Sequence, residues 1–165
     1  MSTSVTKIYV DMDGVIADFE KRFKELTGKL PSDYRTEKGF GTNFQKMIDG
    51  GHFETLDQMP DFDVLVLFLE SVPVEKCILS STARPESNFA VAMQKMQWLA
   101  KVGIMWPKVF VPGKHLKQEH ATPNSILIDD TPIVIEQWNA AGGIGILHTD
   151  ALSTIEMLKQ HLDLN

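Results

Sequence analysis

Short apolar segments of the chain run directly into acidic or hydroxyl side chains at three places: Asp11 and Asp13, Ser80 and Ser81, and Asp129 and Asp130. One carboxylate of such a pair could attack phosphorus while its neighbour protonates the leaving oxygen, which splits one difficult step into two easier ones. Clustered carboxylates repel each other unless a cation neutralises them, and such hard oxygen ligands suit Mg²⁺. Phosphoryl transfer requires mainly positioning and charge neutralisation, so we expect a lysine to complete the site.

The elements that must position these residues are predicted from the pattern of apolar side chains. Five short apolar segments are expected to be strands: 7–10, 77–79, 109–111, 126–128 and 144–147. Segments with helical spacing of apolar residues lie between and after them: 16–26, 89–99, 135–138 and 152–162. This alternation predicts an α/β fold with a parallel sheet flanked by helices. Because sites form at the carboxyl ends of parallel strands, the three polar groups should meet at one edge.

Residues 29–60 are too long a stretch for a simple loop in a compact domain. Together with the first helix they predict a small, mostly helical cap inserted after the first strand. We expect a single domain over 1–165, with the core at 1–15 and 75–165 and the cap at about 16–74. Three phenylalanines of this cap could stack on a nucleobase or form the cap's own core: Phe40, Phe44 and Phe53.

Composition excludes several classes of protein. The formal net charge of −6 argues against a protein that coats nucleic acid. The single cysteine, Cys77, allows no internal disulfide, which suits a reducing compartment. The longest apolar run, 64–69, is far too short to span a bilayer, and it is expected to be a buried helix. We therefore expect a soluble, cytoplasmic protein without a membrane partner; a homodimer is one possible assembly, but the sequence leaves the oligomeric state open.

The same residues resemble the motifs of a known family. The segment Asp11–Phe19 is similar to the first motif of the haloacid dehalogenase (HAD) superfamily, and in particular to its 5′(3′)-deoxyribonucleotidase branch with the phage and bacterial relatives. Ile78–Ser81 resembles the second motif, and Ile126–Asp130 followed by Thr131-Pro132 resembles the fourth. The resemblance covers nearly the whole chain and implies a Rossmann-like, HAD-type sheet.

The resemblance implies a role for each acidic residue. Asp11 would be the nucleophile and a Mg²⁺ ligand. Asp13 would be the general acid and base, with its backbone carbonyl on the metal. Asp129 would be the remaining protein ligand of the metal, and Asp130 would support it from behind.

The phosphate-binding residues have alternatives. Ser80 would donate a hydrogen bond to the phosphoryl oxygens with Ser81 beside it, whereas a rival register of the second motif uses Thr82. Strand length favours Ser80. The third motif requires a lysine, for which Lys117 is favoured over Lys114 because the stretch that follows Lys117 resembles the phage relatives.

The implied activity is that of a Mg²⁺-dependent phosphomonoester hydrolase that works through an aspartyl phosphate. Its partner would be a small molecule, a (deoxy)nucleoside monophosphate, which makes the protein a 5′-nucleotidase. One alternative is a phosphatase of nucleic-acid ends or of phosphosugars, and another is a non-catalytic phosphate-binding module on the same fold. The base, the sugar and the choice between 5′ and 3′ phosphate stay open.

Overall fold

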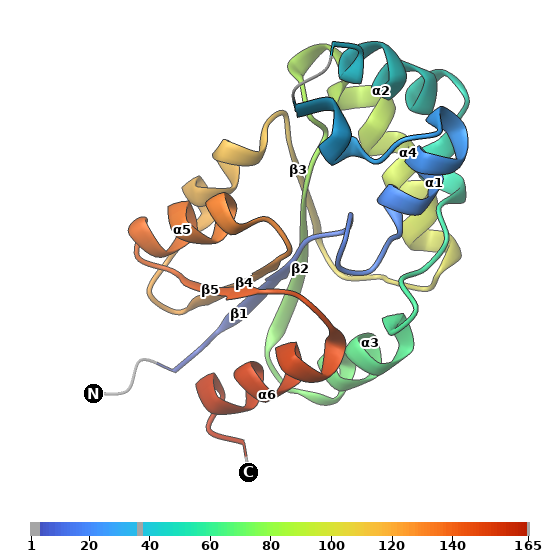
Figure 1. The fold of residues 1–165 in the computed structure, drawn as a ribbon. Coiled ribbons are helices and arrows are strands. Elements are labelled where there is room, and N and C mark those ends of the chain that lie inside the picture. Colours follow the sequence, from blue (N-terminus) through green and yellow to red (C-terminus); the bar gives the residue numbers. More distant parts are fainter. Residues whose placement is uncertain (1–3, 36–37, 165) are drawn as a thin grey trace.

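A five-stranded parallel sheet forms the centre of the computed structural model, which describes residues 4–35 and 38–164. The strands lie in the order β3-β2-β1-β4-β5. Their bounds are β1 (Lys7–Val10), β2 (Glu75–Ser81), β3 (Lys108–Val111), β4 (Ser125–Asp129) and β5 (Ile144–Leu147) (Figure 1). The predicted α/β fold class with a Rossmann-like parallel sheet is confirmed.

The central strand β1 sets the position of the first acidic pair. Val10, its last residue, is aligned with Ile78 of β2 and with Ile128 of β4. The next residue, Asp11, continues this alignment, because its backbone N–H donates to the carbonyl of Ile128 at 3.0 Å. Asp11 therefore lies at the carboxyl edge of the sheet, beside the ends of both neighbouring strands.

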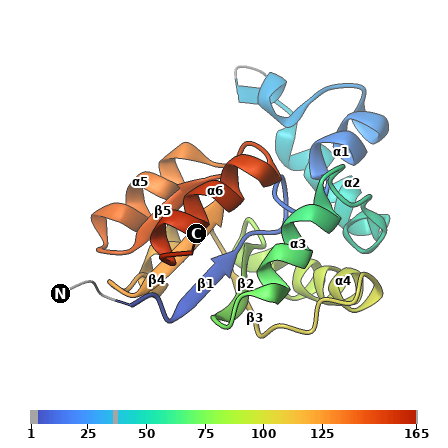
Figure 2. The ribbon, with the colours of Figure 1, turned by 90° about the horizontal axis from the view of Figure 1, so that it is seen from below.

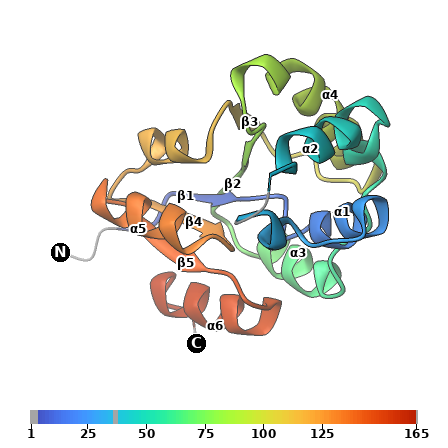
Figure 3. The same ribbon diagram turned by 45° about the horizontal axis from the view of Figure 1, so that its top comes forward.

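Helices cover both faces of the sheet, as the apolar character of its strands requires. On one face, Ile8 and Val10 pack into a cluster with side chains of α3 (Phe62–Ser71), α4 (Asn88–Lys101) and α6 (Ala151–His161). On the other face, Tyr9 packs against α5 (Pro132–Ala140) (Figure 3). None of the helices within residues 4–35 and 38–164 is both long enough and apolar enough to cross a membrane.

The apolar run 64–69 lies within α3, so a helix forms there as expected, but only one of its faces is buried. Leu65 and Leu69 point into the core, whereas Val64 and Leu67 are exposed. The helix packs against α6, and Figure 1 shows it at the opposite end of the molecule from α2, although it lies beside α1 and α2 in the view of Figure 2. We therefore propose that α3 belongs to the core layer and that the cap is shorter than 16–74.

The segment that we propose as the cap contains α1 (Phe19–Thr27), α2 (Phe40–Asp49) and the 3₁₀ helices η1 (Pro31–Arg35) and η2 (His52–Thr55). Asp18 caps the start of α1, where its side chain accepts from the N–H of Lys21, and Gly28 caps the end with a φ of +80°. Five phenylalanines hold the cap together, with neighbouring ring centroids 5.5–6.4 Å apart: Phe19, Phe23, Phe40, Phe44 and Phe53.

The helix α4 joins the cap to the sheet through three hydrogen bonds. The Gln94 side chain accepts from the backbone N–H of Phe53 at 3.1 Å and donates to the carbonyl of Ile48 at 2.8 Å. The indole N–H of Trp98 donates to the carbonyl of Leu56 at 2.8 Å. Since α4 itself packs in the core of the sheet, these bonds fix the η2 side of the cap relative to the strands.

Candidate active site

A buried lysine joins two of the predicted acidic residues. Lys117 lies in the 3₁₀ helix η4 (Lys114–His120) and is 1% exposed. Its Nζ is 2.9 Å from Oδ1 of Asp11 and 2.6 Å from Oδ2 of Asp129, and both carboxylates are themselves buried. The backbone N–H of Met12 also donates to Asp11 Oδ1, at 2.8 Å. Asp11 is thus held in one orientation at the end of β1.

The ionisation of this group reflects a balance between burial and charge. Burial raises the pKa of Asp11, but the charges of Lys117 and Lys95 outweigh it and leave that pKa lowered. Burial lowers the pKa of Lys117, but Asp11 and Asp129 outweigh it and leave the pKa raised. The pKa of Asp129 is raised by burial and by the neighbouring Asp11 charge. Asp11 and Lys117 are therefore held as an ion pair.

Three carboxylates at this edge could hold a metal ion. Asp11, Asp129 and Asp130 each offer one oxygen, and these oxygens lie within 4.8 Å of one another. The Asp130 side chain borders the open cleft, but the protein atoms that surround it, followed by the charges of Asp11 and Asp129, raise its pKa to about 7. Hard oxygen donors that repel each other in this way fit a divalent cation. Asp130 lies against Gly14, where a Cβ atom would be only 2.0 Å from its Oδ2, so the site requires glycine there.

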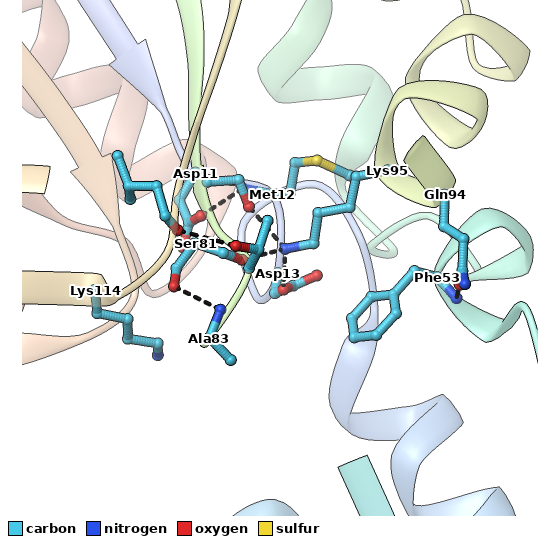
Figure 4. A network of polar contacts seen from close by, with 12 residues as sticks. Asp11, Met12, Asp13, Phe53, Ser81, Ala83, Gln94, Lys95 and Lys114 are labelled. Atoms are coloured by element: carbon cyan, nitrogen blue, oxygen red, sulfur yellow. Dashed lines mark hydrogen bonds and ion pairs between the residues drawn. The ribbon is translucent and has the colours of Figure 1, made fainter. Parts of the chain in front are cut away.

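A second buried lysine orients Asp13. The Nζ of Lys95, on α4, donates to Asp13 Oδ2 at 2.7 Å, to Ser80 Oγ at 2.8 Å and to the carbonyl of Ser81 at 2.9 Å. Figure 4 shows this lysine reaching between Asp13 and the ring of Phe53, whose centroid is 5.5 Å from Nζ. The other oxygen of Asp13, Oδ1, is buried and has no hydrogen-bond partner among the described residues, which leaves it available for a proton.

The three candidate hydroxyl groups have different surroundings. Ser81 lines the cleft above Asp11, and its Oγ accepts from the N–H of Ala83 at 3.1 Å (Figure 4). Ser80 is fully buried, and its Oγ accepts a hydrogen bond from Lys95 Nζ. Thr82 is also fully buried, and its Oγ1 donates to Asn88 Oδ1 at 2.6 Å. Ser81 is therefore the hydroxyl that a ligand in the cleft would meet.

The cleft has a volume of about 500 Å³ and lies between the sheet edge and the cap. Its sheet side includes Asp11, Asp13, Lys117 and Lys114, and the Nζ of Lys114 donates to Thr131 Oγ1 at 3.0 Å. Its cap side includes the three predicted phenylalanines. Phe44 and Phe53 are buried, and Phe40 is 38% exposed. The structure therefore brings three of the predicted acidic residues (Asp11, Asp13 and Asp130), both candidate lysines and the cap aromatics to one cavity, and Asp129 is buried next to it.

Two residues of this site were missed in the sequence. Phe19 lines the cleft and stacks on Phe53 with an angle of 11° between the ring planes. Its position predicts an apolar residue of the first helix and the end of the segment that resembles the first motif, and neither pattern predicts that it lines a cavity. Lys95 lies within the helix predicted at 89–99, and the apolar spacing there assigns it no role. The signal that could have found it is its spacing, since Lys95 lies four residues after Val91 and three before Trp98, and both of these are buried.

Comparisons with known proteins identify the fold. No protein-family model matches the chain, and no curated protein matches it either. Among solved structures, a hydrolase from Streptococcus pneumoniae TIGR4 aligns with a TM-score of 0.56 and 17% identity, covering 99% of this chain and 100% of that one. A HAD family hydrolase from Deinococcus radiodurans R1, with bound phosphate and sodium, aligns with a TM-score of 0.50 and 12% identity over 96% of this chain and 89% of that one.

The chain has a HAD-type fold. A D,D-heptose 1,7-bisphosphate phosphatase from Burkholderia thailandensis aligns as well, with a TM-score of 0.50 and 12% identity over 93% of this chain and 98% of that one. The likeness to these HAD-type structures extends over almost the entire length of each chain, so the alignment includes the cap region as well as the sheet. At 12–17% identity the likeness establishes the fold, and the chemistry has to be argued from the side chains.

Proposed function

We propose that the protein is a metal-dependent phosphatase that hydrolyses phosphomonoesters through a phosphorylated Asp11, with nucleoside monophosphates as substrates. The observation that carries this proposal is the position of Lys117 between Asp11 and Asp129 at the base of a cleft. Burying these three charged side chains costs free energy, and the two carboxylates carry one more charge than the lysine between them can neutralise. A dianionic phosphoryl group and a divalent cation are the ligands that would match this charged triplet.

The proposed reaction has two halves. In the first, a carboxylate oxygen of Asp11 attacks phosphorus, the bond from phosphorus to the leaving oxygen breaks, and Asp13 gives that oxygen a proton. In the second, a water molecule attacks phosphorus and gives a proton to Asp13, and the Asp11 carboxylate is released. Ser81 and Lys117 would hold the phosphoryl oxygens. Lys95 holds Asp13 by Oδ2, which leaves Oδ1 for the proton.

The metal we propose is Mg²⁺. Asp11, Asp129 and the backbone carbonyl of Asp13 would bind the ion directly. Asp130 would lie next to these ligands without binding the ion itself. When bound, the ion would neutralise charge on the phosphoryl oxygens and on the carboxylates. The donor set fits this assignment because all of its atoms are oxygens and because oxygens of Asp11, Asp129 and Asp130 lie within 4.8 Å of one another.

We expect Mg²⁺ to raise the thermal stability of the protein and to be required for its activity. A ligand present at 100 times its Kd stabilises the folded state by about 2.7 kcal/mol. Asp129→Asn should therefore abolish most of the increase in Tm on addition of Mg²⁺, as well as the activity that Mg²⁺ restores after treatment with a chelator. Scanning calorimetry with and without the ion measures the first effect, and a phosphate-release assay measures the second.

Asp63→Asn is the matched control for the metal, because Asp63 is exposed at the start of α3 and makes no hydrogen bond or ion pair with any described residue. This variant should respond to Mg²⁺ as the wild type does. Full activity of the wild type in excess chelator, after complete removal of metal, would contradict the proposed metal requirement.

Nucleoside monophosphates are proposed as substrates because the cap side of the cleft is largely aromatic. Stacking of one base on aromatic side chains contributes about 1–3 kcal/mol in proteins that bind single strands. We expect kcat/KM for nucleoside monophosphates to exceed that for sugar phosphates by about tenfold or more, which is about 1.4 kcal/mol. Phe40→Ala should reduce this ratio, because Phe40 is the most exposed of the predicted cap phenylalanines and its loss should disturb the packing least.

Phe89→Ala removes the same side chain from an exposed position of α4 that does not line the cleft, so it should leave the ratio unchanged. Sugar phosphates hydrolysed as well as nucleotides would favour the phosphosugar alternative. A strong preference for phosphorylated oligonucleotides would favour the alternative that acts on nucleic-acid ends. Tight phosphate binding without turnover would favour the non-catalytic module.

A further inference from the structure

The cap side of the cleft carries one charged residue among the residues that the structure describes. Most of that side is aromatic or apolar, and the polar exceptions are Glu20 and Ser32. Glu20 lies in the first turn of α1 and its side chain is exposed. It makes no hydrogen bond or ion pair with any described residue, so its charge is free to act on whatever occupies the cleft.

The cations of the cleft lie on the opposite side. Lys117 is paired with Asp11 and Asp129, and Lys114 lies near the sheet edge, where it donates to Thr131. A phosphoryl group at Asp11 would therefore lie beside two lysines, whereas the remainder of the same substrate, under the cap, would meet Glu20 as the one charged side chain among the described residues that line that side. The sheet side thus offers cations as well as carboxylates, whereas the described part of the cap side offers a carboxylate and no cation.

The position of Glu20 is not explained by the start of the helix alone. A carboxylate in the first turn of a helix interacts favourably with the helix dipole. In α1, however, Asp18 already accepts from the N–H of Lys21 at 3.1 Å and supplies the cap. A helix-stabilising role for Glu20 would also have no effect on which substrate is preferred, which gives a way to distinguish the two roles.

We propose that Glu20 is a specificity-determining residue that selects phosphomonoesters whose leaving group carries no second anionic group. The inference rests on the proposed phosphatase activity and refines its substrate class. Leaving groups that are neutral, or that carry a cation or hydrogen-bond donors, are accepted under the cap. Bisphosphates, diphosphates and carboxylated esters are disfavoured by repulsion between like charges. A nucleoside monophosphate satisfies this rule, because its base and sugar are uncharged.

The test uses three phenyl phosphates of similar size with different charges at the para position: carboxylate, hydroxymethyl and aminomethyl. For each protein, the ratio of kcat/KM for the aminomethyl ester to that for the carboxylate ester is measured in Mg²⁺. Comparing this ratio between wild type and Glu20→Gln cancels the intrinsic reactivity of the leaving groups. We expect the substitution to lower the ratio by about three- to tenfold, as for two charges several ångströms apart near water.

Salt provides a second readout. The Debye length is about 3 Å at 1 M ionic strength and about 10 Å at 0.1 M, so high salt should reduce the wild-type ratio and leave that of Glu20→Gln almost unchanged. Glu156→Gln is the matched control. It removes the same charge from an exposed position on α6, outside the cleft, where the Glu156 carboxylate is paired with Lys159 at 3.2 Å. Its ratio should equal that of the wild type.

The outcomes separate this inference from the proposed function. If the wild type hydrolyses the esters but Glu20→Gln has the same charge ratio, Glu20 does not determine specificity and the phosphatase proposal stands. If the wild type hydrolyses none of the three esters nor any nucleotide, the proposed function is wrong and the role of Glu20 fails with it. A ratio lowered equally in Glu156→Gln would show a general effect of net charge and would also overturn the inference.

Discussion

Asp11→Asn should lower kcat by about four orders of magnitude or more while the protein stays folded. Removing a covalent nucleophile leaves only the contribution of binding and positioning, and losses of this size are usual for such residues. The fold should survive because Asn has almost the same shape and because Lys117 keeps Asp129 as a partner at 2.6 Å. Single-turnover phosphate release measures the loss, and circular dichroism checks the fold.

The same experiment can identify the intermediate. Wild-type protein quenched in acid during turnover of a ³²P-labelled substrate should carry label, whereas Asp11→Asn should carry none. Asp63→Asn, an exposed carboxylate changed in the same way, should keep full activity. A well-folded Asp11→Asn protein with near-normal activity would show that another group attacks the phosphorus.

Lys117→Met should destabilise the protein by about 3–5 kcal/mol, because it leaves the buried carboxylates of Asp11 and Asp129 without their counter-charge. Activity should be lost as well, since the phosphoryl group would then meet two unneutralised carboxylates. Urea denaturation, followed by circular dichroism, measures the free energy of unfolding for wild type and variant.

Lys114→Met is the matched control for Lys117, because it makes the same change in the same 3₁₀ helix at an exposed position. Its free energy of unfolding should stay within about 0.5 kcal/mol of the wild type, as for most surface substitutions. Equal destabilisation by the two changes would mean that the buried triplet does not carry the stability assigned to it. Loss of activity in Lys114→Met alone would make Lys114 the lysine of the site.

The sheet could be predicted from the sequence because its strands are short apolar segments that end in polar residues. A strand that is buried on both faces does not have to alternate apolar and polar side chains. Consecutive residues of Lys7–Val10 and of Ser125–Asp129 are indeed buried. The convergence of Asp11 and Asp129 on one edge then follows from parallel topology alone. What the pattern does not specify is register, which decides that Ser81, and not Ser80, reaches the cleft.

The helix α4 shows where prediction from periodicity fails. The apolar residues with helical spacing in the segment 89–99 are Phe89, Met93, Met96 and Leu99, yet Leu99 is buried and the other three side chains are exposed. The face that is buried contains Lys95 and Trp98. A hydrophobicity pattern places every lysine on the exposed face of a helix. It therefore predicts the wrong face for Lys95, which α4 buries next to Asp13.

The cap was only partly predictable for a related reason. Its 3₁₀ helices and the aromatic cluster have no regular period, and its stability comes from rings that contact each other across α1, α2 and η2. Phe19 belongs to this cluster and to the cleft at once. A phenylalanine at a helical position gives no sign in the sequence that it also borders a cavity.

The attachment of the cap through α4 bears on how the substrate range of this protein could change. Gln94 and Trp98 of α4 hydrogen-bond to the η2 side of the cap, and Lys95 of the same helix orients Asp13. Substitutions at this contact between α4 and η2 would therefore disturb the catalytic residues as well as the pocket. On the opposite wall, the side chains of Glu20 and Phe40 make no hydrogen bond or ion pair with the reacting groups among the described residues. New leaving groups could therefore be accommodated by changes on α1 and α2 alone, so directed evolution of specificity should begin with those two helices.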